Sequence, residues 1–212
     1  MAQVFPRSAN TIAVISIIGA ILVVAAAIAF LILSPMSYSP KNQNQPVPFS
    51  HQQHVGSLGI DCRYCHTTVE TSAFAGMPSS QVCMNCHSEV LSDSDELAPV
   101  RDSAANGKPL VWNRVYTLPD FVYFDHSAHV TKGVACASCH GQVDQMPVLT
   151  QAVSLQMSWC MNCHSDPTSN IRPRNQVTNM AWQAPDNIAQ VRQQLIQQYH
   201  VQSKTSCSTC HR

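Results

Sequence analysis

Phe124-Asp-His126-Ser-Ala-His129-Val130 stands ahead of two further patterns, Cys136-Ala-Ser-Cys139-His140 and Cys160-Met-Asn-Cys163-His164. Two cysteines separated by two residues and followed by a histidine form the motif that attaches a c-type haem. The two thiols bond covalently to the porphyrin, and the adjacent histidine reaches the iron. This stretch therefore predicts a segment that folds around two haems.

Every cysteine of the chain belongs to a motif of this kind. The five motifs are Cys62-Arg-Tyr-Cys65-His66, Cys83-Met-Asn-Cys86-His87, Cys136-Ala-Ser-Cys139-His140, Cys160-Met-Asn-Cys163-His164 and Cys207-Ser-Thr-Cys210-His211. Zinc knuckles and disulfides also pair cysteines, but neither explains a histidine after the second cysteine five times out of five. We therefore expect five haem c groups, each held by the two cysteines of its motif and ligated by its histidine.

The segment that opens the haem region resembles the one quoted first. Phe49-Ser-His51-Gln-Gln-His54-Val55 has the same pattern, and two motifs follow each copy. From the first histidine to the first cysteine the spacing is 11 and 10, and between the two motifs it is 21 and 24. Such self-similarity predicts two copies of one two-haem unit, at 49–90 and 124–167, with a fifth haem in 186–212.

Histidines outside the motifs are the expected distal iron ligands. There are five, one for each haem: His51, His54, His126, His129 and His200. Apolar residues recur at helical spacing from Ile188 to Tyr199, which predicts a short amphipathic helix ahead of His200. Met157 is an alternative axial ligand, which would raise the potential of its haem and leave one histidine idle.

The composition favours a domain built on its cofactors. Only 11% of the 212 residues are charged, the formal net charge is zero, and there are 13 prolines against 7 glycines. Beyond the first 35 residues there are few long apolar runs and no strong strand-type alternation. We expect a loop-rich, mostly irregular and α-helical multihaem domain, in which haem faces replace much of the aliphatic core. No nucleic-acid partner is expected.

The N-terminal region predicts a membrane anchor. Thr11 to Leu33 is an uncharged run of 23 residues, long enough to cross a bilayer as a helix, and Ser34-Pro35 ends it. A cleaved signal would have a shorter apolar region, so an uncleaved anchor is favoured. The expected segments are a cytoplasmic N-terminus at 1–10, an anchor at 11–34, a linker at 35–48 and the haem domain at 49–212. Arg7 and the site of haem attachment both orient the haem domain to the periplasmic side of a bacterial inner membrane.

Phe-x-His-x-x-His-Val followed by the haem motif resembles the class III multihaem cytochromes. Val111-Trp-Asn-Arg-Val-Tyr-Thr-Leu-Pro-Asp-Phe-Val-Tyr-Phe124 and Met157-Ser-Trp159-Cys160, together with the anchor, resemble the pentahaem cytochrome c subunit of bacterial alternative complex III. That resemblance implies a respiratory or photosynthetic membrane complex. In it, an iron–sulfur, molybdopterin-like subunit and polytopic quinol-site subunits would deliver electrons, and a monohaem cytochrome c or a soluble carrier would accept them.

The sequence disfavours two other classes of function. A stand-alone membrane-anchored quinol dehydrogenase usually has its first motif close to the helix and a methionine soon after it. Here 28 residues separate Leu33 from Cys62, and Thr67-Thr68-Val69 follows the first motif. A haem enzyme such as a nitrite reductase needs an open axial position, whereas five spare histidines can close every iron here. The expected role is electron transfer within an oxidoreductase complex, without catalysis by this chain.

Overall fold

The computed structural model describes residues 6–33 and 44–211, which belong to two units, one up to residue 39 and the other from residue 40. The predicted N-terminus at 1–10 and the predicted linker at 35–48 lie partly outside the described residues. Each unit is described by itself.

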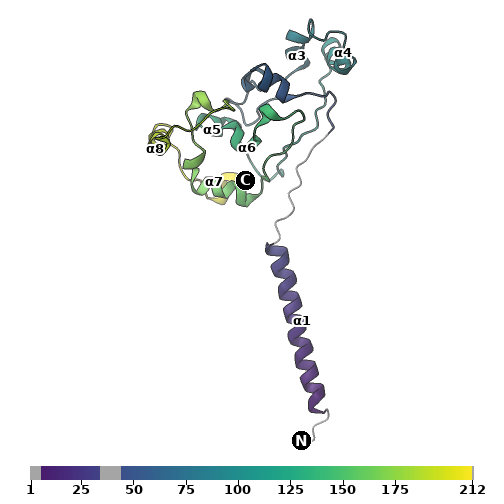
Figure 1. The fold of residues 1–212 in the computed structure, drawn as a ribbon, viewed down its shortest axis with the longest axis vertical. Coiled ribbons are helices and arrows are strands. Elements are labelled where there is room, and N and C mark those ends of the chain that lie inside the picture. The colour runs from purple at the N-terminus through teal and green to yellow at the C-terminus, as the bar shows by residue number, and fades with distance from the viewer. Residues whose placement is uncertain (1–5, 34–43, 212) are drawn as a thin grey trace. The chain divides into compact units, whose positions relative to one another are not determined.

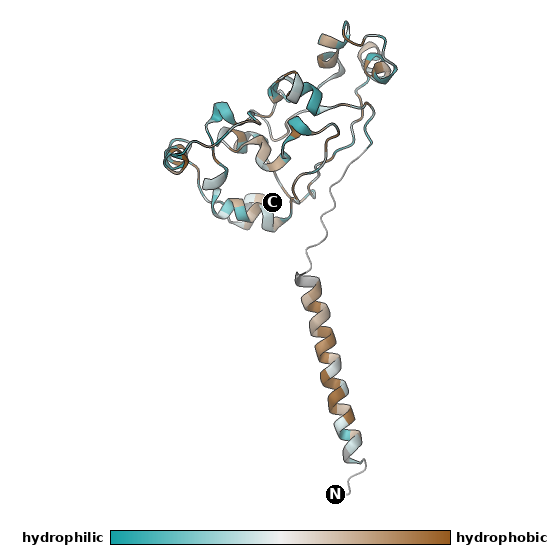
Figure 2. Ribbon diagram, in the orientation of Figure 1, coloured by the Kyte–Doolittle hydropathy of each residue, from teal (hydrophilic) through white to brown (hydrophobic). Residues whose placement is uncertain are grey.

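The first unit is one long helix, α1, from Arg7 to Leu33. Its 27 residues span about 40 Å at the usual rise per residue, more than the ~30 Å hydrocarbon core of a bilayer. The stretch Ser8–Phe30 is long and apolar enough to cross a membrane, and Figure 2 shows its run of hydrophobic residues. These properties fit a membrane anchor, and a signal sequence near the N-terminus would share them.

Short helices joined by loops make up the second unit (Figure 1). The α-helices are α2 (Cys62–Cys65), α3 (Ser80–His87), α4 (Ala98–Asn106), α5 (His126–Thr131), α6 (Cys136–His140), α7 (Met157–Ser165), α8 (Ile188–Gln198) and α9 (Cys207–Cys210). Single turns of other helix types are η1 (Gln52–Ser57), η2 (Asp95–Leu97), η3 (Val143–Gln145), η4 (Pro167–Asn170) and η5 (Arg174–Gln176). Residues 44–211 contain no strand, and an isolated bridge joins Val134 to Ile171. The prediction of a loop-rich, mostly irregular and α-helical domain is confirmed.

The apolar core of this unit is small. One cluster joins Val69, Val130 and Val177, and thereby connects the two predicted repeats. A second cluster joins Ile171 to Leu195 and Tyr199. Both are modest for a unit of this length, because a domain that folds alone normally buries a much larger aliphatic core. Covalently bound haems, with their large apolar faces, would provide the missing buried surface.

The helix predicted ahead of His200 is confirmed as α8. Its periodic apolar residues point inward, and Leu195 and Tyr199 are buried against Ile171. The guanidinium of Arg174 lies 4.1 Å from the centre of the Tyr199 ring, a cation–π contact that fixes the end of the helix. The C-terminal segment is therefore attached to the residues that follow the second repeat before it reaches the last motif.

A close backbone contact brings η1 of the first repeat against η3 of the second. Gln52 donates its backbone N–H to the carbonyl of Met146 at 3.0 Å. Gly56 lies so close to the carbonyl of Asp144 that a Cβ atom at this position would overlap it. Only glycine permits such an approach of two backbones, so Gly56 is required for the packing of the repeats.

Candidate haem-binding sites

Each cysteine pair lies on one turn of helix. The pairs belong to α2, α3, α6, α7 and α9 in chain order, and they are called sites I to V below. Residues three apart on a helix face the same side, so each helix presents two thiols together. Within the described residues no group of three or more histidine, cysteine or acidic side chains could hold a metal ion.

Helix α5 positions two of the predicted distal histidines, His126 and His129, one turn apart. Asp125 caps the helix, since its side chain accepts a hydrogen bond from the backbone N–H of Ala128 at 3.2 Å. Its own backbone carbonyl accepts a hydrogen bond of 2.6 Å from Nδ1 of His129. Asp125 thus fixes both the start of the helix and the orientation of one imidazole.

This dual role of Asp125 gives a prediction for stability. Replacing a capping Asp by Ala typically costs about 1 kcal/mol, so Asp125→Ala should lower the free energy of unfolding by about that amount. Asp125→Asn is the matched control, because an Asn side chain still caps the helix, and it should leave stability nearly unchanged. Denaturant-induced unfolding of the haem-loaded protein measures both. Equal losses in the two variants would contradict a capping role.

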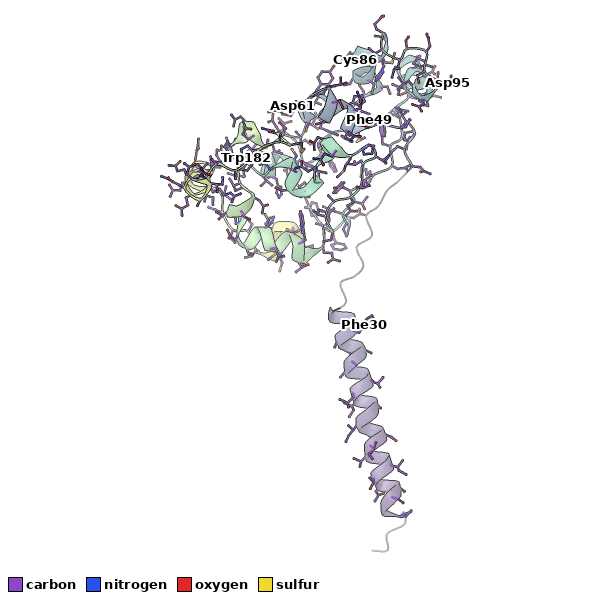
Figure 3. The ribbon with its side chains drawn as sticks, in the orientation of Figure 1. Phe30, Phe49, Asp61, Cys86, Asp95 and Trp182 are labelled. Atoms are coloured by element: carbon purple, nitrogen blue, oxygen red, sulfur yellow. The ribbon has the colours of Figure 1, made fainter. Side chains whose placement is uncertain are left out.

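Two phenylalanines hold the histidine pairs in the same way in both repeats. The Phe124 ring meets His126 edge-on at 4.8 Å and stacks on His129 at 4.5 Å. The Phe49 ring (labelled in Figure 3) meets His51 edge-on at 4.9 Å and stacks on His54 at 4.4 Å. The interplanar angles also agree, at 90° and 24° for Phe124 and 87° and 25° for Phe49. The shared sequence pattern therefore corresponds to a shared local geometry.

Three predicted distal histidines face the histidine of a motif. The ring-centre separations are 6.2 Å for His54–His87, 6.3 Å for His126–His140 and 6.0 Å for His129–His164. Two metal–nitrogen bonds of about 2 Å plus two ring half-widths give a separation of about 6 Å. The three pairs are thus spaced as two imidazoles on opposite sides of one iron would be.

His51 lies near His66, the histidine of site I. Burial lowers the pKa of His51 to about 4, with further contributions from His66 and then His54. The pKa of His140 is also about 4, through burial and then the neighbouring His126, His66 and His51. Both rings are therefore neutral at physiological pH, the form in which imidazole ligates a metal. The effect of His66 on His51 favours the predicted pairing of these two histidines.

Backbone carbonyls orient most of these imidazoles. Nδ1 bonds to a carbonyl oxygen in seven of them: His54 to Ser50 at 2.8 Å, His66 to Gly76 at 2.7 Å, His87 to Val90 at 2.8 Å, His126 to Ala73 at 2.9 Å, His129 to Asp125 at 2.6 Å, His164 to Lys204 at 3.0 Å and His211 to Phe121 at 3.2 Å. A histidine that donates Nδ1–H keeps Nε2 as the free ligand, as is usual in metal sites. Nδ1 of His51 is buried without a hydrogen-bond partner.

Site V is arranged differently. The His211 ring stacks on Phe121 at 5.9 Å, and the backbone N–H of Tyr123 donates to the carbonyl of Cys210 at 2.7 Å. His200 follows α8 with a positive φ of 50° and an exposed side chain, and the described residues show no ring contact between it and His211. Met157 begins α7 and is 70% exposed. Neither predicted distal ligand is thus brought onto His211.

Thiols of different sites lie close to one another. A hydrogen bond between Cys62 and Cys136 lowers the pKa of the first thiol and raises that of the second. Burial and then Cys83 raise the pKa of Cys65. At the next sites, the pKa of Cys139 is about 11 through burial, Cys163 and Cys160, and that of Cys160 is raised by burial and then Cys210. Thiols of neighbouring sites therefore lie close enough to influence one another.

The sequence patterns did not single out Tyr116. Its ring meets that of His140 at 4.5 Å. Its hydroxyl donates to the carbonyl of Cys139 at 3.4 Å and accepts from the backbone N–H of Ala152 at 2.8 Å. The only signal was the aromatic-rich stretch from Val111 to Phe124, which marks a likeness but assigns no role.

Comparison with known proteins identifies the family of the chain. The family model for cytochrome c7 and related cytochrome c matches residues 47–103 and 122–212, which together contain all five motifs. The chain belongs to this family. Membership makes c-type haems its cofactors and electron transfer by a multihaem cytochrome its role.

A relative shares part of the sequence. The multihaem cytochrome c subunit of menaquinone reductase from Nitratidesulfovibrio vulgaris (strain Hildenborough) is 41% identical over 120 residues. The matched region covers 56% of this cytochrome and 55% of the relative, so the chain spans about half of the relative's length.

Proposed function

We propose that this cytochrome transfers electrons through five haem c groups, one at each of sites I to V. The observation that carries the proposal is the spacing of three histidine pairs at 6.0–6.3 Å, each with one motif histidine and one distal histidine. His51 and His66 form the fourth pair by the same pattern. At site V, His211 is the proximal ligand, and His200 or Met157 is the proposed distal one.

A haem bound in this way supplies an iron that changes between the ferric and ferrous states. At sites I to IV a proximal and a distal histidine would close both axial positions of a bound haem, and at site V His200 or Met157 would complete the pair with His211. The Nδ1 hydrogen bonds and the stacked phenylalanines hold the rings in place, so little rearrangement accompanies a change of charge. Closed axial positions leave no place for a substrate, which favours an electron carrier over a haem enzyme.

We further propose that the chain works in a membrane complex, with α1 as its anchor and the haem domain in the periplasm. Its resemblance to the subunit of alternative complex III favours electron flow from quinol, through an iron–sulfur partner, to a periplasmic cytochrome or another soluble acceptor. The relative is a subunit of menaquinone reductase, which favours a second direction, towards menaquinone. In both directions we propose that this cytochrome works between a quinone site and a soluble electron carrier.

Gentle detergent purification tests the proposal. We expect polytopic and iron–sulfur subunits to co-purify, and we expect menaquinol to reduce the haems of the assembly. If instead a reduced soluble carrier reduces the haems and they then reduce menaquinone, the direction is the second one. Oxidation of quinol by the isolated chain would support a stand-alone quinol dehydrogenase and overturn the complex. A carbon monoxide adduct of the reduced protein would contradict the closed axial positions.

The anchor can be tested separately. Replacing residues 1–34 by a cleavable signal should give a soluble haem-loaded protein that no longer associates with its complex. Removing the same residues without a signal should leave the chain in the cytoplasm without haem, because haem attachment takes place across the membrane. Stable membrane association of the version with the cleavable signal would mean that the segment from Thr11 to Leu33 is not the main anchor.

A further inference from the structure

Hydrogen bonds between the five haem sites indicate their order in space. Within a repeat, the two distal histidines are one helical turn apart, so the two sites that they face are neighbours. His51 and His54 link site I to site II, and a hydrogen bond of 3.0 Å from Asn85 to the hydroxyl of Tyr64 joins the two motifs directly. His126 and His129 on α5 link site III to site IV in the same way.

The two repeats meet at sites I and III. The Cys62 and Cys136 side chains lie close enough for each to shift the pKa of the other. The consecutive residues Val177 and Thr178 bind to both sites. The hydroxyl of Thr178 donates to the carboxylate of Asp61 at 2.8 Å, and Cys136 donates its backbone N–H to the carbonyl of Val177 at 3.0 Å. The attachment sites I and III are therefore neighbours, joined by the segment Val177–Thr178.

Each repeat also holds the distal histidines of the other at this junction. Ala73, in the loop after the site I motif, accepts hydrogen bonds from both the backbone N–H and Nδ1 of His126. Reciprocally, Met146, in the loop after the site III motif, accepts the backbone N–H of Gln52, next to His51. The two repeats are thus interlocked through sites I and III, whereas sites II and IV lie outside the junction.

Site V continues from site IV. The backbone carbonyl of His164 accepts hydrogen bonds from the hydroxyl of Ser203 at 2.8 Å and the backbone N–H of Lys204 at 3.3 Å. Nδ1 of His164 donates in turn to the carbonyl of Lys204 at 3.0 Å. The segment that leads into the last motif is therefore bound to the histidine of site IV.

We infer that the five sites follow one another in the order II–I–III–IV–V, so that the first motif of the chain lies inside the row and the second motif ends it. This inference rests on the proposed function and adds the path that electrons take through the five haems. Sites II and V are the two ends at which electrons enter and leave. In Figure 1, α3 of site II lies at one end of the haem-binding unit, and the C-terminal end at site V lies well away from it.

The orientation of the histidine rings gives site III its own spectroscopic marker. Its rings, His126 and His140, are nearly parallel at 11°, whereas the pairs at sites II and IV are tilted by 58° and 59°. Parallel ligand planes split the iron orbitals more rhombically than tilted planes, so the ferric haem at site III should give a distinct electron paramagnetic resonance signal. His126→Met should remove that signal and so assign it.

The order predicts which ligand change alters the potential at site III. His51→Met and His54→Met should each create a haem of raised potential, which is reduced before the others. The added electron makes adjacent haems harder to reduce, and the effect falls with distance. In a redox titration followed by resonance, His51→Met should therefore shift the site III signal to a more negative potential, and His54→Met should leave it in place.

Other outcomes are equally informative. A shift caused by His54→Met alone would mean that site II lies between sites I and III, as in the order of the sequence, and would overturn the inference. Equal shifts in both variants would indicate a compact cluster and overturn it as well. The absence of any covalent haem would instead refute the proposed function. If either variant fails to mature, electron cryomicroscopy of the unaltered protein shows directly whether the haem at Cys62 and Cys65 has sites II and III as its neighbours.

Discussion

The purified protein will contain five covalently bound haems, and the double variant Cys207→Ala/Cys210→Ala will contain four. Thioether bonds resist acid–acetone extraction, which removes haem held only by iron ligation. The mass of the mature protein should therefore exceed the mass of its polypeptide by five haem masses, and the mass of the double variant by four. Site V is suited to the deletion because the hydrogen bonds that join sites I to IV do not involve Cys207 or Cys210.

Mass spectrometry of the extracted protein provides the measurement. Cys207→Ser/Cys210→Ser is a second variant that keeps polar side chains at both positions, and it should also lose one haem. Bound zinc with ten free thiols would contradict the assignment of the motifs as haem sites. Retention of five haems by the double variants would show that the fifth group is held elsewhere.

His129→Met will raise the midpoint potential of one haem and leave the others close to their original values. The ring of His129 lies 6.0 Å from that of His164, so methionine at this position would face the same iron. A thioether ligand favours the ferrous state more than an imidazole does, and it still closes the coordination site. The loss of the hydrogen bond from Nδ1 to the carbonyl of Asp125 is local and should not disturb the other sites.

His200→Met is the matched comparison for this experiment. If His200 ligates site V, its replacement will also raise one potential, and the unaltered protein will lack the weak far-red band of a His/Met haem. If Met157 is the ligand, that band will be present before any substitution, and Met157→Leu will abolish it while His200→Met changes nothing. An unchanged titration for His129→Met would remove the ligand assignments in the second repeat.

Sequence alone was sufficient for the features that depend on short-range chemistry. The spacing Cys-x-x-Cys-His is a local requirement of covalent haem attachment, so Cys62 or Cys207 can be assigned without any knowledge of the fold. The helical period from Ile188 to Tyr199 is equally local, and α8 confirms it. The long apolar run near the N-terminus likewise predicts α1 from length and composition.

The tertiary structure decided which histidines, backbone carbonyls and haem sites lie next to one another. Carbonyls such as those of Ala73 and Lys204 carry no signal in the sequence, because any residue offers one, yet they orient His126 and His164 across 53 and 40 residues. The contact of Cys62 with Cys136 likewise depends on the way in which two similar repeats interlock, which the repeats themselves do not encode in their patterns. Sequence determined the residues that can bind haem, since that chemistry is local. Only the packing of distant segments determined which sites are neighbours, because neighbours in space are set by long-range backbone contacts.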